Sequence, residues 1–196
     1  MKVSHAVAGF ALIATQVAHP GLGSMLQQGM ELVYTSGGTE TPWSVDTLAR
    51  DTTFGGKRGC IRVRLRTSPT QATPDTRMQC ADSMMMYAWD TTSSSLRATR
   101  PLSANASIEF PLSGERKARY ETGRWTKEVI GGQTIDVLPT TVTTLDANGR
   151  AVSRLRERFA TVLATATGGI FETPDMAAPG GWRTTREFNL IAIRPR

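Results

Sequence analysis

Short runs in which apolar and polar residues alternate dominate the chain. In RGCIRVRLR, residues 58–66, three apolar residues alternate strictly with three arginines. Successive side chains of a β-strand point to opposite faces, so this pattern predicts a strand with one buried and one wet face. The row of arginines is then either a docking surface or the solvated side of a sheet.

Further extended runs are separated by Gly-Gly, proline-rich and Asn-Gly turn signals. Strands are expected at residues 30–36, 43–51, 58–66, 77–90, 106–113 and 182–194, and in two hairpins at residues 116–132 and 133–159.

The two expected hairpins differ in their turns. The first is expected to turn at Thr122–Gly123, and the second at Asn148–Gly149, a preferred type I′ pair. The arm after Asn148–Gly149 also carries helical spacing, but a strand to about Phe159 is favoured. Residues 68–76 hold two prolines and are excluded from central strand. Residues 163–181, rich in small side chains, are expected to form a long loop.

These elements predict an all-β fold. A length of 196 residues suits one domain, and a hydrophobic content of 39% is enough for a core. The expected architecture is a mainly antiparallel, single-domain barrel, half-barrel or sandwich of about nine or ten strands.

The amino-terminal segment reads as a signal. After Met1 and Lys2 comes an apolar run at residues 6–18, which is too short to span a bilayer but suits a signal-peptide core. We therefore expect a targeting segment at residues 1–23, a β domain at residues 24–196, and a periplasmic or extracytoplasmic location.

The two cysteines agree with export. An even pair in an exported chain is usually a disulfide. If residues 58–90 contain a hairpin centred on Thr70, the numbers of facing residues sum to 140, which places Cys60 opposite Cys80. Cys60 has the parity of the arginines, so the bridge lies on the wetter face or a bulge near Gly59 shifts the register.

Charge indicates a surface that contacts a partner. The formal net charge is +6, mostly from arginine, which suits bidentate contacts to carboxylates and phosphates. No nucleic-acid-binding motif accompanies it, so we expect a protein partner, with peripheral membrane association as a further option. The candidate partner-binding residues are Arg62, Arg64, Arg66, Arg154, Arg156, Arg158, Trp89 and Trp125.

Several chemistries are excluded if the leader is removed. His5 and His19, the two histidines, both lie within it. A mature chain then has no Ser-His-Asp or Cys-His system and no imidazole metal site, and no nucleotide-binding loop occurs. The sequence predicts no enzyme, cofactor or metal. Methionines 84–86 suggest thioether ligands for copper, but gap-filling in a core is the stronger interpretation.

Three segments of the carboxy-terminal half carry a resemblance: VLPTTVTTLDANGRAVSRLRERF, ATATGGIFETPD and APGGW. They resemble exported β-rich proteins of Gemmatimonas-like bacteria, over most of the chain after the leader. The resemblance brings no known activity and no catalytic residues. Phototrophic members of that group have membrane-extrinsic polypeptides that hold the photosynthetic reaction-centre complex, so it implies such a complex as the partner.

The leading hypothesis is a non-catalytic, extracytoplasmic docking subunit of a membrane-associated assembly. One alternative is a periplasmic carrier that holds an apolar ligand in a β half-barrel, in a cavity of several hundred cubic ångströms, on the order of typical ligand pockets. The other is a hydrolase that uses a pair of carboxylates as acid and base. Its candidate carboxylates are Glu121, Glu128, Asp136, Glu157, Glu172 and Asp175.

Overall fold

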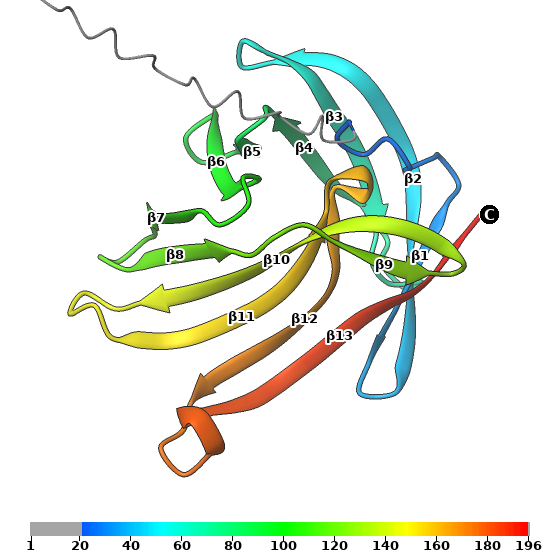
Figure 1. The fold of residues 1–196 in the computed structure, drawn as a ribbon. Coiled ribbons are helices and arrows are strands. Elements are labelled where there is room, and N and C mark those ends of the chain that lie inside the picture. Colours follow the sequence, from blue (N-terminus) through cyan, green and yellow to red (C-terminus); the bar gives the residue numbers. More distant parts are fainter. Residues whose placement is uncertain (1–20, 196) are drawn as a thin grey trace, which may run out of the picture.

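A computed structural model describes residues 21–195, which form a single antiparallel sheet of thirteen strands (Figure 1). The strands are β1 (Glu31–Ser36), β2 (Thr39–Phe54), β3 (Lys57–Arg66), β4 (Asp75–Ala81), β5 (Met85–Asp90), β6 (Ser95–Pro101), β7 (Ser107–Pro111), β8 (Lys117–Thr122), β9 (Thr126–Ile130), β10 (Gln133–Leu145), β11 (Ala151–Ala160), β12 (Thr165–Pro174) and β13 (Trp182–Arg194). Two short 3₁₀ helices, η1 (Thr161–Leu163) and η2 (Pro179–Gly181), precede β12 and β13.

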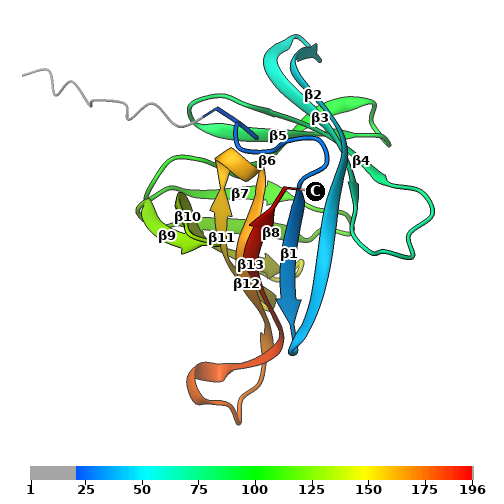
Figure 2. The ribbon, with the colours of Figure 1, turned by 90° about the vertical axis from the view of Figure 1, so that its right-hand side faces the viewer.

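The sheet curls almost into a barrel. Its order is β6-β5-β4-β3-β2-β1-β13-β12-β11-β10-β8-β7, and β9 pairs with the first half of β10. Figures 1 and 2 show the strands wrapping round so that β6 returns towards β8. The predicted all-β antiparallel class is confirmed, with more strands than the nine or ten expected.

Bulges supply much of the curvature. The pairing of β2 with β3 shifts register three times, between Val45 and Phe54. One shift leaves an extra residue on β3 beside Gly59, whose φ is +70°. An extra residue bends a strand and increases its twist, and a positive φ favours glycine there. The bulge expected near Gly59 is therefore present.

The concave face of the sheet holds the core. Its most deeply buried residues include Leu32, Val45, Val63, Val137 and Leu163, each at most 1% exposed to solvent. An enclosed void among the described core residues, lined in part by Leu26 and Val63, has a volume of about 10 Å³. It is far smaller than the cavity of several hundred cubic ångströms that the carrier alternative expects.

Residues 21–29 cap one end of this core. Leu26 is 2% exposed, and Leu22 packs against both groups of core residues. The Gly23 amide donates to the Thr161 carbonyl at 2.8 Å, and the Met25 amide donates to Val162. Leu22 and Gly23 thus belong to the folded domain, although the sequence assigns them to the leader. Residues 1–20 of that expected leader lie outside the described residues.

The hairpin of β3 and β4 has the predicted register. The numbers of paired residues sum to 140, as for Ile61 opposite Gln79 and Leu65 opposite Asp75. Cys60 and Cys80 form the expected disulfide, with Cα atoms 4.1 Å apart. Both cysteines are buried even though Cys60 has the parity of the outward-facing arginines.

Two expected turns differ from the structure. There is no hairpin at Thr122–Gly123, because β8 and β9 lie end to end along β10, and the chain reverses at Gly131–Gly132 instead. Both of these glycines have positive φ, as a two-residue type I′ turn requires. The hairpin of β10 and β11 is present, but Asn148 does not have positive φ. The turn there is closed by the Gly149 amide bonding to Asp146 and by a bulge, so type I′ was wrong.

The long loop expected at residues 163–181 is also wrong. Residues 165–174 form β12, a central strand, because Gly168 and Gly169 leave space for neighbouring side chains. A Cβ on Gly168 would meet the Arg158 guanidinium, and one on Gly169 would lie 2.8 Å from the Phe188 ring. The arm after Asn148–Gly149 is a strand as favoured, and β6 is a strand that the sequence pattern did not reveal.

A buried ion pair links β6, at one end of the curled sheet, to β11 on the opposite side. Arg100 of β6 lies 2.8 Å from Glu157 of β11, with side chains 15% and 5% exposed. The Arg100 guanidinium also lies 4.0 Å from the centre of the Phe159 ring. No backbone ladder joins β6 to β8 or β11, so side chains make the contact between these walls: this ion pair, and the packing of Met86 and Leu102 against Phe159.

Replacing both cysteines tests the first of these cross-links. Cys60 and Cys80 are 20 residues apart, so the loop that the bridge removes from the unfolded state is worth about 3 kcal/mol. We expect C60A/C80A to lower the free energy of unfolding by about that amount in urea titrations. A change of less than about 1 kcal/mol would contradict this role.

Replacing Arg100 tests the second cross-link, the ion pair between Arg100 and Glu157. Arg100→Ala leaves the Glu157 carboxylate buried without a cation, which costs about 3–5 kcal/mol of folding free energy. The double variant R100M/E157L removes both charges and is expected to lie within about 1 kcal/mol of the wild type. Urea unfolding of both variants measures this, and a double variant no more stable than Arg100→Ala would count against the explanation.

Candidate functional site

The structure does not bring the two predicted groups of arginines together. One group lies on β3 and the other on β11, and β2, β1, β13 and β12 separate them around the sheet. Arg62 and Arg64 are exposed on the outer face of β3. Arg66 is ion-paired to Asp46 at 2.9 Å and bonds to the Gln71 carbonyl. The single positive face considered from the sequence is therefore not formed.

The arginines of β11 are engaged with carboxylates of the same protein. Arg154 and Arg156 lie 2.7 and 2.9 Å from the buried carboxylate of Glu172 on β12. The hydrogen bond from Arg154 is the largest influence on Glu172 and, with Arg156, holds its pKa below the ordinary value despite burial. The Arg154 guanidinium also stacks 4.2 Å from the Trp182 ring.

Arg158 ties the end of a hairpin to the sheet. It contacts Glu128 of β9 and donates to the Asn189 side chain at 2.7 Å, while the Thr167 hydroxyl donates to Glu128 at 3.2 Å. Figure 1 shows the hairpin of β9 and β10 crossing over β11, β12 and β13. The role of Arg158 visible in the fold is thus to hold this hairpin in place.

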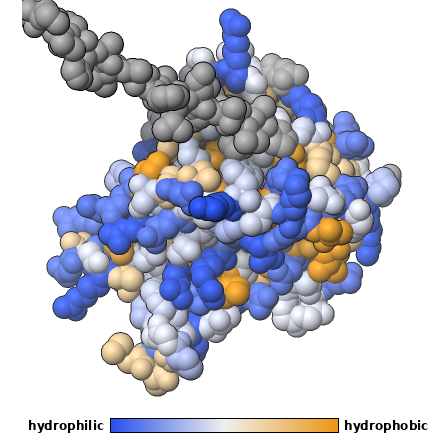
Figure 3. All heavy atoms as spheres, viewed as in Figure 1, coloured by the Kyte–Doolittle hydropathy of each residue, from blue (hydrophilic) through white to orange (hydrophobic). Residues whose placement is uncertain are grey.

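The two candidate tryptophans are half-buried. Trp89 of β5 packs edge-on against Phe54, with ring centres 4.4 Å apart. Trp125 lies in the break between β8 and β9. Exposed apolar side chains elsewhere are scattered, and the face in Figure 3 is mainly hydrophilic with small, separate hydrophobic groups. Contact of these residues with a partner remains a prediction.

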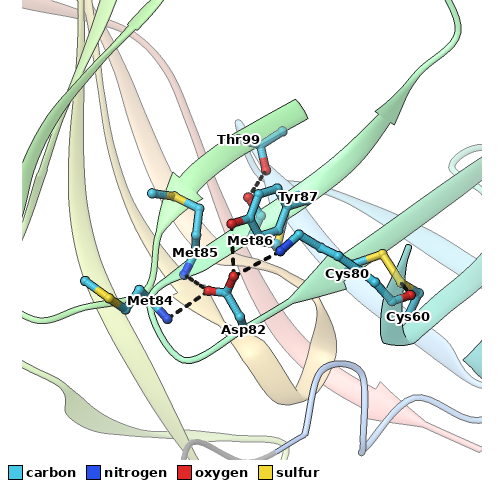
Figure 4. A network of polar contacts seen from close by, with 9 residues as sticks. Cys60, Cys80, Asp82, Met84, Met85, Met86, Tyr87 and Thr99 are labelled. Atoms are coloured by element: carbon cyan, nitrogen blue, oxygen red, sulfur yellow. Dashed lines mark hydrogen bonds and ion pairs between the residues drawn. A yellow bond between two sulfur atoms is a disulfide. The ribbon is translucent and has the colours of Figure 1, made fainter. Parts of the chain in front are cut away.

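A polar network stands beside the disulfide (Figure 4). Asp82 accepts hydrogen bonds from the amides of Met84 and Met85, from the Tyr87 hydroxyl at 2.9 Å and from Lys57 at 3.2 Å. Burial by itself would raise the pKa of Asp82, but these four hydrogen bonds together lower it. The bond to Asp82 likewise raises the pKa of Lys57. This network fixes the turn between β4 and β5.

The methionine run does not assemble a copper site. Met84 is 64% exposed, whereas Met86 is buried against Leu102 and Phe159. Gap-filling therefore describes Met86. Within residues 21–195, no group of three His, Cys, Asp or Glu side chains is placed to hold a metal ion.

The candidate acid–base carboxylates are mostly ion-paired. Glu128, Glu157 and Glu172 pair with arginines as described, Asp136 pairs with Lys127 at 2.9 Å, and Asp175 lies 3.8 Å from Arg183. A hydrolase needs one carboxyl group that gives up and takes back a proton. These five carboxylates are each engaged with a basic side chain of the same protein, and the structure brings no two of them together as a free acid–base pair in the described part of the chain.

Two of the open clefts on the described surface carry apolar side chains. The first, here called the seam cleft, lies between the last strands of the sheet and has a volume of about 740 Å³. Its lining residues come from the β5–β6 hairpin and from the end of β7, and are Asp90, Thr92, Arg97, Ala98, Phe110, Pro111, Leu112 and Ser113.

The second, here called the aromatic cleft, has a volume of about 210 Å³ and opens at the hairpin end of β1 and β2. It is lined by Tyr34, Thr35, Ser36, Thr41, Trp43, Thr67, Arg186 and Phe188. The Tyr34 ring lies 4.5 Å from Trp43 and 6.2 Å from Phe188, and Phe188 lies 6.0 Å from Phe171. Figure 2 shows β1, which carries Tyr34, beside β13, which carries Phe188.

Tyr34 forms the floor of the aromatic cleft. Its hydroxyl donates to the Ala166 carbonyl at 2.9 Å. Burial raises its pKa to about 12, in spite of the hydrogen bond with Thr165 and the charge of Arg77. The hydroxyl is therefore protonated at physiological pH and donates its hydrogen bond to the backbone of Ala166.

The chain matches no family model, no curated protein and no solved structure. Neither cleft was found from the sequence. The alternation of residues indicates which side chains face inward, but Tyr34, Trp43, Phe171 and Phe188 meet only because β12, β13, β1 and β2 are neighbours in the sheet.

Glu172 gives a test by pH. A carboxyl group whose folded-state pKa is lowered stabilises the fold above its unfolded pKa of about 4.3 and loses that contribution as pH falls through the folded-state value. We expect Glu172→Gln to be less stable than wild type by about 2 kcal/mol at pH 7, and the difference to begin shrinking as the pH falls below about 4 and to vanish below the folded-state pKa of Glu172. Urea unfolding at several pH values measures it. A difference that is constant or grows towards low pH would contradict the assignment.

Proposed function

We propose that this protein is a non-catalytic, extracytoplasmic docking subunit of a membrane-associated assembly, and that it takes an extended segment of its partner at the seam cleft. The observation that carries the proposal is the incomplete closure of the sheet. The edges of β6 and β7 are each paired on one side only, to β5 and to β8.

Free strand edges favour a polypeptide partner. Their outward N–H and C=O groups form a template for another strand, and edge addition is a recurrent mode of peptide recognition. In the seam cleft these groups lie beside apolar side chains, among them Phe110 and Leu112, of which Leu112 is 43% exposed. The cleft thus offers both backbone pairing and pockets for alternate side chains.

The Cys60–Cys80 disulfide supports the extracytoplasmic location in this proposal. A buried disulfide persists in oxidising surroundings outside the cytoplasm. In residues 21–195 no helix has the length and apolar character to cross a membrane. The reaction-centre complex implied by the resemblance of the carboxy-terminal half is the first assembly to test, with Arg62 and Arg64 as a secondary contact.

Gentle solubilisation of the membranes of the bacterium that makes this chain tests the proposal. We expect the tagged wild-type chain to migrate with a large complex on a density gradient. Leu112→Asp places a charge in the seam cleft and is expected to lower the bound fraction at least about tenfold, the effect of about 1.4 kcal/mol. Val129→Asp is the matched control, because Val129 is 72% exposed on β9, away from the seam cleft.

Circular dichroism shows whether both variants keep the fold. A wild-type chain found only as a free monomer would refute docking altogether. Equal loss of binding in Leu112→Asp and Val129→Asp would place the contact elsewhere and overturn the seam cleft as its site.

A further inference from the structure

The aromatic cleft combines two features that the fold itself does not use together. Its walls are aromatic, and Arg186, which lines it, has no carboxylate partner in the described part of the chain. Arg77 lies behind the aromatic wall: its guanidinium is 5.6 Å from the centre of the Trp43 ring, and it lines the small void in the core. By contrast, the arginines of β11 are each held by a carboxylate.

The charge around this cleft is therefore positive. None of the residues that line it is acidic. Glu187, the next residue to Arg186, belongs to the neighbouring surface hollow and accepts a hydrogen bond from Asn189 at 3.0 Å. Asp75, at the start of the strand that carries Arg77, accepts from Gln71 at 3.2 Å. A ligand in the cleft therefore contacts one guanidinium group and several hydroxyl-bearing side chains, and no carboxylate of the lining.

The aromatic part is accessible as well. Phe171 is 38% exposed, and it faces Arg186 directly across the pairing of β12 with β13. Gly169 keeps the adjacent position free of a side chain, because a Cβ there would collide with the Phe188 ring. The aromatic surface is therefore continuous from Tyr34 to an exposed ring at the rim.

We propose that the aromatic cleft binds a small ring-bearing carboxylate. Its flat apolar part packs against Trp43, Phe188 and Phe171, and its carboxylate receives a paired hydrogen bond from the Arg186 guanidinium. Arginine matches a carboxylate bidentately, and offset or edge-on ring contacts favour a flat aromatic ligand. The hydroxyls of Thr41 and Thr67 lie in the same wall to orient it.

Size and charge exclude other ligand classes. A volume of about 210 Å³ is below the range of about 300–1,000 Å³ usual for drug-sized ligands, which limits the ligand to one or two rings. The floor is closed by Tyr34 and a filled core, so a long acyl chain has no path inward. Cations are disfavoured by Arg186, the charged residue of the lining.

Calorimetric titration of the full-length protein with 1-naphthoate tests this inference. We expect one site with a dissociation constant on the order of 0.1–1 mM, as a ligand of this size permits. Arg186→Gln is expected to weaken binding about tenfold, and Phe171→Ala to weaken it several-fold. Arg62→Gln removes the same charge from the outer face of β3 and is expected to leave binding unchanged.

The neutral isostere 1-naphthalenemethanol separates stacking from charge recognition and is expected to bind at least about fivefold more weakly. No saturable binding of naphthoate would overturn the inference, as would equal weakening by Arg186→Gln and Arg62→Gln. Isostere affinity equal to that of naphthoate would overturn the carboxylate specificity. Because none of these measurements involves the seam cleft or a membrane, their failure leaves the proposed docking function untouched.

Discussion

The curvature of a single sheet is the constraint on which the structure depends. This fold has no second layer to cover the apolar face of its sheet. The sheet must therefore curl until the side chains of that face pack against one another. Bulges in β2 and β3, together with the cap at residues 21–29, make this possible. The outcome is a well-filled core, with the seam cleft where the two ends of the sheet meet and the aromatic cleft at the hairpin end of β1 and β2.

The sheet is closed by side-chain contacts and not by backbone hydrogen bonds between its end strands, so free strand edges remain. A complete barrel removes its edges, whereas the Arg100–Glu157 pair joins the walls and leaves one edge of β6 and one edge of β7 without a neighbouring strand. A buried ion pair is costly to desolvate and adds little net stability over apolar packing. What it supplies here is a direct contact between β6 and β11, two strands that no backbone ladder joins.

Net charge is a poor guide to the electrostatics of this molecule. The excess of arginine is spread around the sheet, and much of it is matched locally by Glu172, Glu128 and Asp46. These carboxylates come from neighbouring strands or from the hairpin that crosses them. The cations that remain without a carboxylate among the described residues include Arg62, Arg64, Arg77 and Arg186, and the last two stand at an aromatic wall. Position in the sheet, not the total of +6, decides where an anion is attracted.

Local sequence determined the class of structure and one long-range contact. Alternation of side chains predicts strands because the pleat has a period of two. A hairpin centred on Thr70 gives the register that pairs Ile61 with Gln79 and places Cys60 opposite Cys80. Where two local signals compete, as two possible turns do, only the tertiary structure decides which element forms. The turn at Gly131–Gly132 prevails over the one expected at Thr122–Gly123 because β8 and β9 both need β10 as a partner. The small residues of β12 form a central strand because Arg158 and Phe188 fill the space above them. Both clefts and the Arg100–Glu157 pair join strands far apart in the chain, and no local pattern encodes which of those strands become neighbours.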